Sequence, residues 1–243
     1  MPGADVSTGH AQKVWRLSLG SFLQTYISES LCFFGDQIGT ANGPEAQPER
    51  AYKARKENPR MSVVSTIKTT DTSRFAVFAA GCFWGVEYNY RKYFQFPSQI
   101  LDIKVGYANG RENIANPSYK QVCTGETDFA EAVLISYEPS QTSYKDLVDF
   151  FFRIHDPTTL NSQGPDMGTQ YRSGIFTTDD EQKKIAEAVK DTFQKEWYKN
   201  KRIVTEIEDF RSFYDAETYH QLYLNKHTER TTCETHFYRE KPE

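Results

Sequence analysis

Several features that would place a chain in a broad class are missing from this sequence. Its 243 residues contain no apolar run as long as the roughly 18 residues that a membrane-spanning helix requires. The formal net charge is −4, so the chain as a whole is acidic. Nucleic-acid binding requires a clustered basic surface, which this charge gives no sign of. We therefore expect a protein with neither a membrane nor a nucleic acid as partner.

Cysteine is scarce as well. The four cysteines are Cys32, Cys82, Cys123 and Cys233, which are widely spaced and include no Cys-x-x-Cys pair. They do not resemble the disulfide framework of a secreted protein. The five histidines make no ligand-spaced pair with them, so we predict no zinc site. Any cysteine chemistry is then expected to be catalytic, in a reducing compartment such as the cytoplasm.

The N-terminal third differs from the rest of the chain. Residues 39–60 are polar, charged and Pro-rich, and we interpret residues 1–72 as a disordered or poorly ordered extension. Residues 11–34 contain only two basic residues, whereas a mitochondrial presequence is usually richer in arginine. A presequence therefore remains only as an alternative interpretation of this segment. The folded catalytic domain is predicted to span residues 73–243 and to be a monomer.

Regular hydrophobic patterns begin at residue 74. They predict an order β-α-β-β-α-β, with strands at 74–80, 99–108, 129–139 and 170–178, a helix soon after Gly81 and a second helix at 142–155. Residues 109–128 are expected to form a polar loop. This order is typical of the two-layer, ferredoxin-like split βαβ unit, so we predict an α+β fold.

Further elements are predicted to follow this unit. Thr178 and Glu181 have the spacing of a capping box that opens a long helix. Residues 202–210 alternate as a strand, and Asp215 is placed to cap a last helix. The tail over 227–243 has no periodicity and is expected to be coil.

Cys82 lies between the first predicted strand and the first predicted helix, in the stretch "GCFWG". The positive end of a helix dipole favours the thiolate, which is the nucleophilic form of cysteine. A small, buried and inert cysteine in a turn is the alternative.

A carboxylate stands in an apolar stretch further along. Glu131 follows Ala130 at the start of a predicted strand. In apolar surroundings its pKa would rise and the group would stay protonated as an acid. Because strand alternation also allows a solvent-facing position, the two alternatives remain open. The turn-rich segment 155–174, with Asp166 and Tyr171, is either functional or a plain surface connection.

Five stretches, "GCFWGVE", "GYANG", "SYKQVCTGETDFAEAV", "HDPTTLNSQGPDMGTQYRSG" and "FYDAETYHQLYL", occur in this order between residues 81 and 224. Together they resemble peptide methionine sulfoxide reductase A. The resemblance implies reduction of the S-epimer of methionine sulfoxide, in proteins and as the free amino acid, with thioredoxin as the reductant. It also implies roles in oxidative-stress defence and protein repair.

The resemblance implies a role for each matching residue. Cys82 matches the nucleophile, Glu131 the acid, and Cys233 the resolving cysteine that forms a disulfide with Cys82. The remaining matches are the aromatic pair around the substrate methyl group, the two hydroxyls that hold the sulfoxide oxygen and a supporting carboxylate: Phe83, Trp84, Tyr119, Tyr171 and Asp166. Cys123 is interpreted as a packed structural thiol, and Cys32 lies outside the match.

Two departures from the family pattern concern these roles. Asp128-Phe129 replaces the usual Gly-His before Ala-Glu, and the Gly-Tyr that often precedes Cys233 is absent. Two other functions remain as alternatives. A peroxidase or redox sensor would use Cys82 without the aromatic and tyrosine pocket, and a binding module would use the pocket without turnover.

Overall fold

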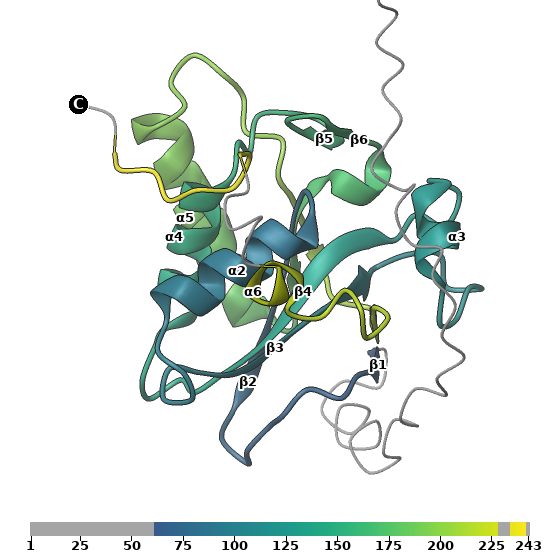
Figure 1. Cartoon of the computed structure of the whole chain (residues 1–243). Helices are drawn as coiled ribbons and strands as arrows, with labels where there is room; N and C mark the ends of the chain where they lie inside the picture. Colours follow the sequence, from purple (N-terminus) through teal and green to yellow (C-terminus); the bar gives the residue numbers. More distant parts are fainter. Residues whose placement is uncertain (1–60, 228–233, 242–243) are drawn as a thin grey trace, which may run out of the picture.

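The computed structural model describes residues 61–227 and 234–241 (Figure 1). Its main element is a mixed seven-stranded sheet with the strand order β1-β9-β3-β4-β2-β7-β8. The strands are β1 (Ser62–Val64), β2 (Arg74–Ala80), β3 (Ile100–Ala108), β4 (Ala130–Tyr137), β7 (Ser173–Thr177), β8 (Glu206–Asp209) and β9 (Ser212–Asp215). A separate two-stranded hairpin joins β5 (Ser162–Gln163) and β6 (Asp166–Met167).

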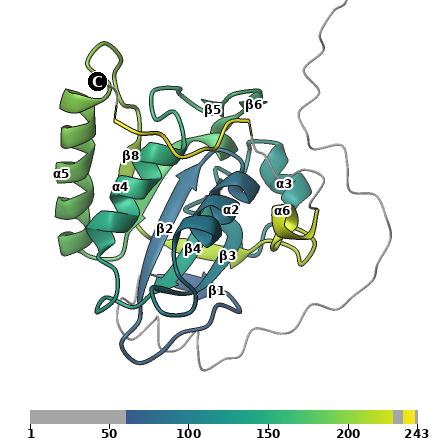
Figure 2. The same ribbon diagram turned by 60° about the vertical axis from the view of Figure 1, so that its left-hand side comes forward.

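The helices share one hydrophobic core with the sheet. This core joins side chains of α2 (Phe83–Tyr93), α4 (Tyr144–Ile154) and α5 (Asp180–Glu196) to those of the central strands. Figure 2 shows α2 in front of the sheet, with α4 and α5 beside it. The predicted α+β class is confirmed. In the part of the chain described, no helix is long and apolar enough to cross a membrane.

The second face of the sheet is covered by a segment that the sequence interpretation assigned to the extension. Met61 and Ile67 are buried in a second core cluster with strand residues such as Leu134. Strand β1 pairs in parallel with β9, and Asp215 accepts hydrogen bonds from the Ser65 hydroxyl (2.5 Å) and the Thr66 N–H (2.7 Å).

The predicted boundary at residue 72 is therefore wrong for residues 61–72, which belong to the folded domain. The physical reason is that every residue of β4 is buried, so both faces of the sheet need an apolar cover. The remainder of the predicted extension, residues 1–60, lies outside the described residues.

Three local predictions also differ from the structure. Within the predicted loop, Ser118 and Gln121 form a capping box that begins a short helix, α3 (Tyr119–Cys123). The predicted capping box at Thr178 is wrong, because Asp179 is the N-cap of α5 and accepts from the Gln182 N–H at 2.9 Å. Asp215 caps no helix, since it ends β9.

Candidate active site

The turn between β2 and α2 places Cys82 at a helix N-terminus. Cys82 is the N-cap residue of α2, and its carbonyl accepts from the Gly85 N–H at 3.2 Å. Gly81 has φ +90°, and a Cβ there would lie 2.5 Å from the Cβ of Gln163, so only glycine fits. The Cys82 side chain is half-buried. The position inferred from the sequence is therefore confirmed.

Glu131 lies on β4, which pairs with β2 in the sheet. Its Oε2 accepts a hydrogen bond of 3.1 Å from the N–H of Phe83, the residue after Cys82. The side chain is 1% exposed, which decides between the two alternatives in favour of the buried acid. Burial raises the pKa of Glu131 to about 8; the Phe83 N–H opposes the rise and the charge of Asp166 adds to it. At pH 7 the carboxyl is therefore mostly protonated.

Two phenols face the same carboxyl. Tyr119 is the first residue of α3, and Tyr171 ends η2 (Thr169–Tyr171). The two side chains lie close enough to affect each other's pKa. Burial raises the pKa of both groups, and the nearby charges of Glu131 and Cys82 raise it further. Both tyrosines are thus neutral hydroxyls that can donate a hydrogen bond near the thiol.

Asp166 belongs to β6, on the hairpin that packs near the Gly81 turn. Burial raises the pKa of Asp166, and His236 opposes the rise. Its charge acts on both Glu131 and Tyr171, which places it close to them. The structure therefore gathers the predicted group of Cys82, Glu131, Tyr119, Tyr171 and Asp166 in one place.

The two aromatic residues after Cys82 differ in how far they are buried. Phe83 is 1% exposed, with its ring 5.2 Å from the His220 ring and 6.1 Å from the Tyr107 ring. Trp84 is half-buried, and one face of its indole stacks on Tyr223 at 3.7 Å between centroids. Trp84 is thus the more accessible member of the pair, with Phe83 supporting it from inside.

The sequence interpretation did not assign roles to two residues of the "FYDAETYHQLYL" stretch that border this group. The Nδ1 of His220 accepts from the Trp84 indole N–H at 3.2 Å, and burial lowers the pKa of this histidine to about 4. Glu217 accepts a hydrogen bond of 2.9 Å from the Tyr119 N–H. The motif itself was the only sequence signal for them, because their partners lie far away along the chain.

The described residues include one of the other three cysteines, Cys123, and one of the two departures from the family pattern, Asp128-Phe129. Cys123 is disulfide-bonded, so its interpretation as a packed structural thiol is wrong. Cys32 and the predicted resolving residue Cys233 lie outside the described residues. Asp128 has φ +60°, the conformation that the usual glycine would adopt, and Phe129 is buried against Gly110.

The described part of the tail, residues 234–241, has no helix or strand, yet it lies against the Cys82 turn. His236 is 3% exposed, and its Nε2 bonds the Ala80 carbonyl at 2.6 Å. Its own carbonyl accepts from the Asn89 side chain of α2 at 3.2 Å. The tail is therefore packed onto the same end of the sheet as the candidate site.

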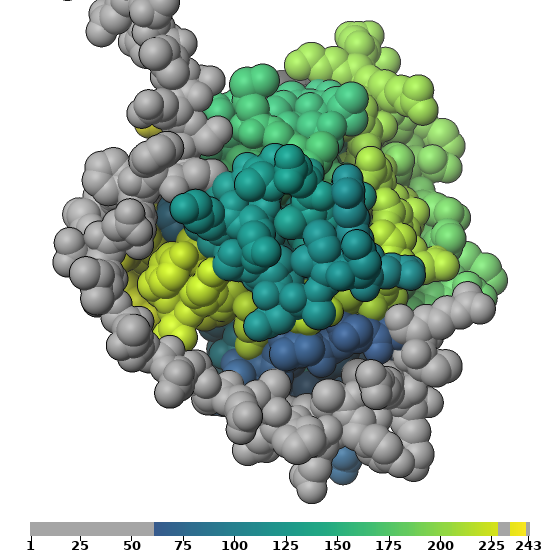
Figure 3. Space-filling view, turned by 90° about the vertical axis from the view of Figure 1, so that its right-hand side faces the viewer, coloured from purple at the N-terminus to yellow at the C-terminus, as the bar shows by residue number. Residues whose placement is uncertain are grey.

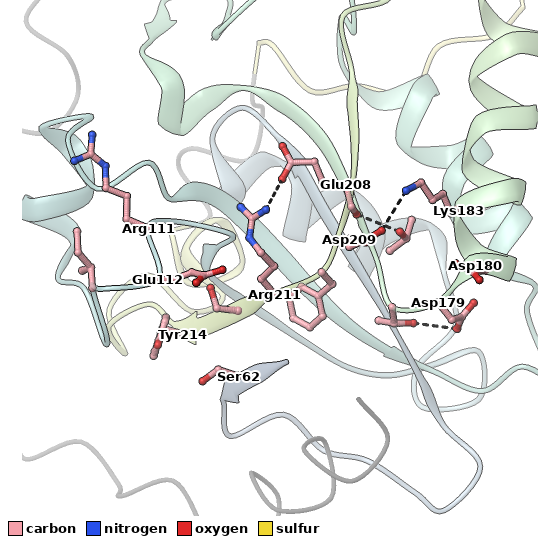
Figure 4. A pocket seen from close by; sticks show the side chains of 15 residues that line it. Ser62, Arg111, Glu112, Asp179, Asp180, Lys183, Glu208, Asp209, Arg211 and Tyr214 are labelled. Carbon is pink, nitrogen blue, oxygen red and sulfur yellow. Dashed lines mark hydrogen bonds and ion pairs between the residues drawn. The ribbon is translucent and has the colours of Figure 1, made fainter. Parts of the chain in front are cut away.

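A polar hollow of about 1130 Å³ lies elsewhere and contains none of the predicted site residues. Its walls come from the edge strands β1 and β8, from β9, from the start of α5 and from the loop at Arg111. Two of its cations are paired, since Arg211 meets Glu208 at 3.4 Å and Lys183 meets Asp209 at 3.2 Å (Figure 4). We assign the chemistry to the surroundings of Cys82, where the candidate nucleophile and the proton donors meet.

The fold and the site together define a class of protein. It is an α+β protein with a cysteine at a helix N-terminus, next to a protonated carboxyl and two neutral phenols. Such a site can protonate an oxygen atom while the thiolate attacks the atom that bears it.

The comparisons with known proteins agree with this class. The family model "Peptide methionine sulfoxide reductase" matches residues 74–242. The peptide methionine sulfoxide reductase of Saccharomyces cerevisiae is 51% identical over 171 residues, which are 69% of this chain and 91% of that protein. MsrA of Methanothermobacter thermautotrophicus is 47% identical over 155 residues, 64% of this chain and 88% of that protein.

Solved structures give the same result. The crystal structure of Mxr1 from S. cerevisiae in reduced form has a TM-score of 0.67 at 50% identity, covering 72% of this chain and 98% of that one. Methionine sulfoxide reductase A of Corynebacterium diphtheriae has a TM-score of 0.58 at 31% identity, covering 72% and 85%. The chain belongs to the peptide methionine sulfoxide reductase family, which confirms the prediction of an oxidoreductase of this kind.

Proposed function

We propose that this protein reduces the S-epimer of methionine sulfoxide, in proteins and as the free amino acid, with Cys82 as the nucleophile. The observation that carries the proposal is the contact between Glu131 and the N–H of Phe83, beside the Cys82 N-cap. It fixes a buried acid at the N-terminus of the helix that favours the thiolate. A peroxidase would also use a proton donor, but peroxide has no methyl group to place against Phe83 and Trp84.

In this mechanism the Cys82 thiolate attacks the electrophilic sulfoxide sulfur while Glu131 donates a proton to the oxygen. Tyr119 and Tyr171 donate hydrogen bonds to the hydroxyl that develops, and Asp166 keeps this polar pocket in place. The substrate sulfur gains two electrons and the Cys82 sulfur loses two. The substrate S–O bond then breaks as its hydroxyl passes to the Cys82 sulfur, methionine leaves, and Cys82 is left as a sulfenic acid.

The methyl group of the substrate is proposed to lie against Trp84, with Phe83 behind it. An apolar methyl group on a sulfur fits an aromatic surface, and the His220 acceptor holds the indole in one orientation. A pocket that fixes the methyl group and the oxygen on separate sides of sulfur distinguishes the two epimers.

Recycling is proposed to use Cys233 as the resolving thiol. Its thiol attacks the Cys82 sulfenic sulfur, water leaves, and thioredoxin opens the disulfide by exchange. The packed tail supports this step, because His236 follows Cys233 by three residues and contacts the carbonyl of Ala80. The disulfide at Cys123 makes that residue the competing exchange partner.

We further propose that β3-β4-β2-β7 with α2 and α4 is a ferredoxin-like split βαβ unit, which the observed strand order supports. The protein is proposed to act as a monomer without metal or cofactor in a reducing compartment, the cytoplasm, with a mitochondrial location as the alternative. Expression with a C-terminal fluorescent protein, with and without residues 1–60, separates the two locations.

The activity is tested with the purified, reduced protein and one equivalent of each epimer of N-acetylmethionine sulfoxide. We expect one methionine derivative per protein from the S-epimer and none from the R-epimer. Hydrogen peroxide serves as the competing oxidant. Faster oxidation of Cys82 by peroxide than by the S-sulfoxide would favour the redox-sensor alternative.

A further inference from the structure

The loop between β9 and α6 (Tyr223–Lys226), residues 216–222, is held to the domain by several partly buried hydrogen bonds. The Gln221 amide bonds both backbone groups of Val105, at 3.1 Å and 2.8 Å, and the Leu222 N–H donates to Glu87 at 2.8 Å. Leu222 has φ +59°, a left-handed conformation that a leucine adopts only where the surroundings impose it. The shape of this loop is therefore fixed by contacts outside it.

This loop lies beside α3. Figure 3 shows the yellow-green segment with α6 directly next to the teal segment with α3. Glu217 bridges the two from the loop side. Its Oε1 accepts from the Tyr119 N–H at 2.9 Å, and its Oε2 accepts from the Tyr107 hydroxyl at 2.7 Å. One carboxylate thus ties the first residue of α3 to strand β3.

The hydrogen bond from Tyr107 to Glu217 connects this loop to the strand pair that carries Glu131. Tyr107 is paired with Glu131 in the register of β3 and β4, so it sits across from the proposed proton donor in the sheet. The Glu217 carboxylate thus fixes Tyr119 with respect to the strand pair that carries Glu131. A helix of only five residues, such as α3, has few bonds of its own to hold its first residue in place.

We propose that Glu217 is a positioning residue that sets the Tyr119 hydroxyl for the sulfoxide oxygen. The role rests on the proposed function, in which Tyr119 stabilises the developing hydroxyl. A hydrogen bond to a developing charge stabilises the transition state only when the donor is already in place. Without Glu217, the start of α3 is free to shift, and the hydroxyl donor is displaced while the thiol and the acid remain.

The test is a double-mutant cycle between Glu217→Ala and Tyr119→Phe, read as the single-turnover rate of methionine formation from the S-epimer. We expect Tyr119→Phe to lower the rate by about 10²-fold, as for loss of one preorganised donor. Glu217→Ala should lower it by about tenfold in the wild-type background, and by less than about twofold once the Tyr119 hydroxyl is gone.

Glu217→Gln should restore most of the rate, since its amide oxygen still accepts from the Tyr119 N–H. Glu138→Ala, in a carboxylate bonded to Thr72 at 2.9 Å, is the matched control and should leave the rate unchanged. If Glu217→Ala does not fold, Glu217→Asp takes its place in the cycle, because one methylene less withdraws the carboxylate from the N–H.

Equal losses in both backgrounds, or no loss from Glu217→Ala and Glu217→Asp, would overturn the positioning role alone. A wild-type protein that forms no methionine would overturn the proposed function and this role with it. The double-mutant cycle and the wild-type turnover therefore distinguish failure of the positioning role from failure of the proposed function.

Discussion

Replacing Glu131 by Gln should make the protein more stable at neutral pH while it impairs catalysis. The carboxyl is 1% exposed, and burial raises its pKa from 4.5 to about 8. The folded state therefore holds a proton that the unfolded chain releases above pH 4.5. A glutamine also fills the site, its carbonyl oxygen can still accept from the Phe83 N–H, and it has no proton to lose.

The sign and size of the effect follow from this difference. Between pH 4.5 and 8, the unfolded wild type is progressively stabilised by ionisation, so wild-type stability falls relative to the variant as pH rises. One pKa unit corresponds to roughly 1.4 kcal/mol, which gives a difference of about 3 kcal/mol at pH 7 and a value near zero at pH 4.5. No correction for solvent screening is needed, because the group is enclosed.

The assay is urea unfolding under reducing conditions, followed by tryptophan fluorescence at pH 5, 6, 7 and 8. Glu126→Gln, at an exposed glutamate, is the control and should show no comparable trend with pH. A stability difference between Glu131→Gln and wild type that stays constant from pH 5 to 8 would refute the buried neutral acid. The same variant should lower the single-turnover rate by about 10²-fold, because an amide cannot donate the proton.

Three further predictions concern the tail, the N-terminal segment and a buried histidine. Cys233→Ser should complete one turnover but lose thioredoxin-driven cycling. Mass spectrometry should detect the trapped sulfenic acid on Cys82, and unimpaired cycling through a Cys82–Cys123 disulfide would contradict this prediction. Deleting residues 1–60 should leave the melting temperature unchanged. Deleting residues 1–68 also removes β1, Met61 and Ile67, and it should lower the free energy of unfolding by about 3 kcal/mol or more. Equal effects of the two deletions would be inconsistent with the second core cluster. Burial lowers the pKa of His155 from 6.5 to about 3, so wild-type stability should fall as pH drops below 6.5, by about 2 kcal/mol at pH 5. His155→Gln should flatten that decline in urea titrations, and an identical slope in both proteins would refute the cause.

Local signals predicted the parts of the site that are local in sequence. The strand, Gly81 and the helix after it place Cys82 at a helix N-terminus, and all of these lie within one short stretch. Burial of Glu131 could not be decided in this way. Alternation assigns one face of β4 to solvent, and only the distant Met61 and Ile67 show that the second face is covered too.

The unassigned residues share this dependence on distant contacts. Glu217 meets Tyr107, 110 positions earlier, and Trp84 meets His220, 136 positions later. Helix α3 spans five residues, which is too short for a hydrophobic period to appear, although the Ser118–Gln121 capping box does mark its start. Sequence patterns describe one element at a time, and these contacts form only when the sheet is assembled.

The role of Cys82 is the central claim, and one measurement tests it most directly. Wild type and Cys82→Ser are each mixed, without reductant, with one equivalent of the S-epimer of N-acetylmethionine sulfoxide. We expect one methionine derivative per wild-type protein, with oxidation mapped by mass spectrometry to Cys82, and none from the variant. Methionine formation by Cys82→Ser at the wild-type rate, or oxidation that maps to another residue first, would contradict it.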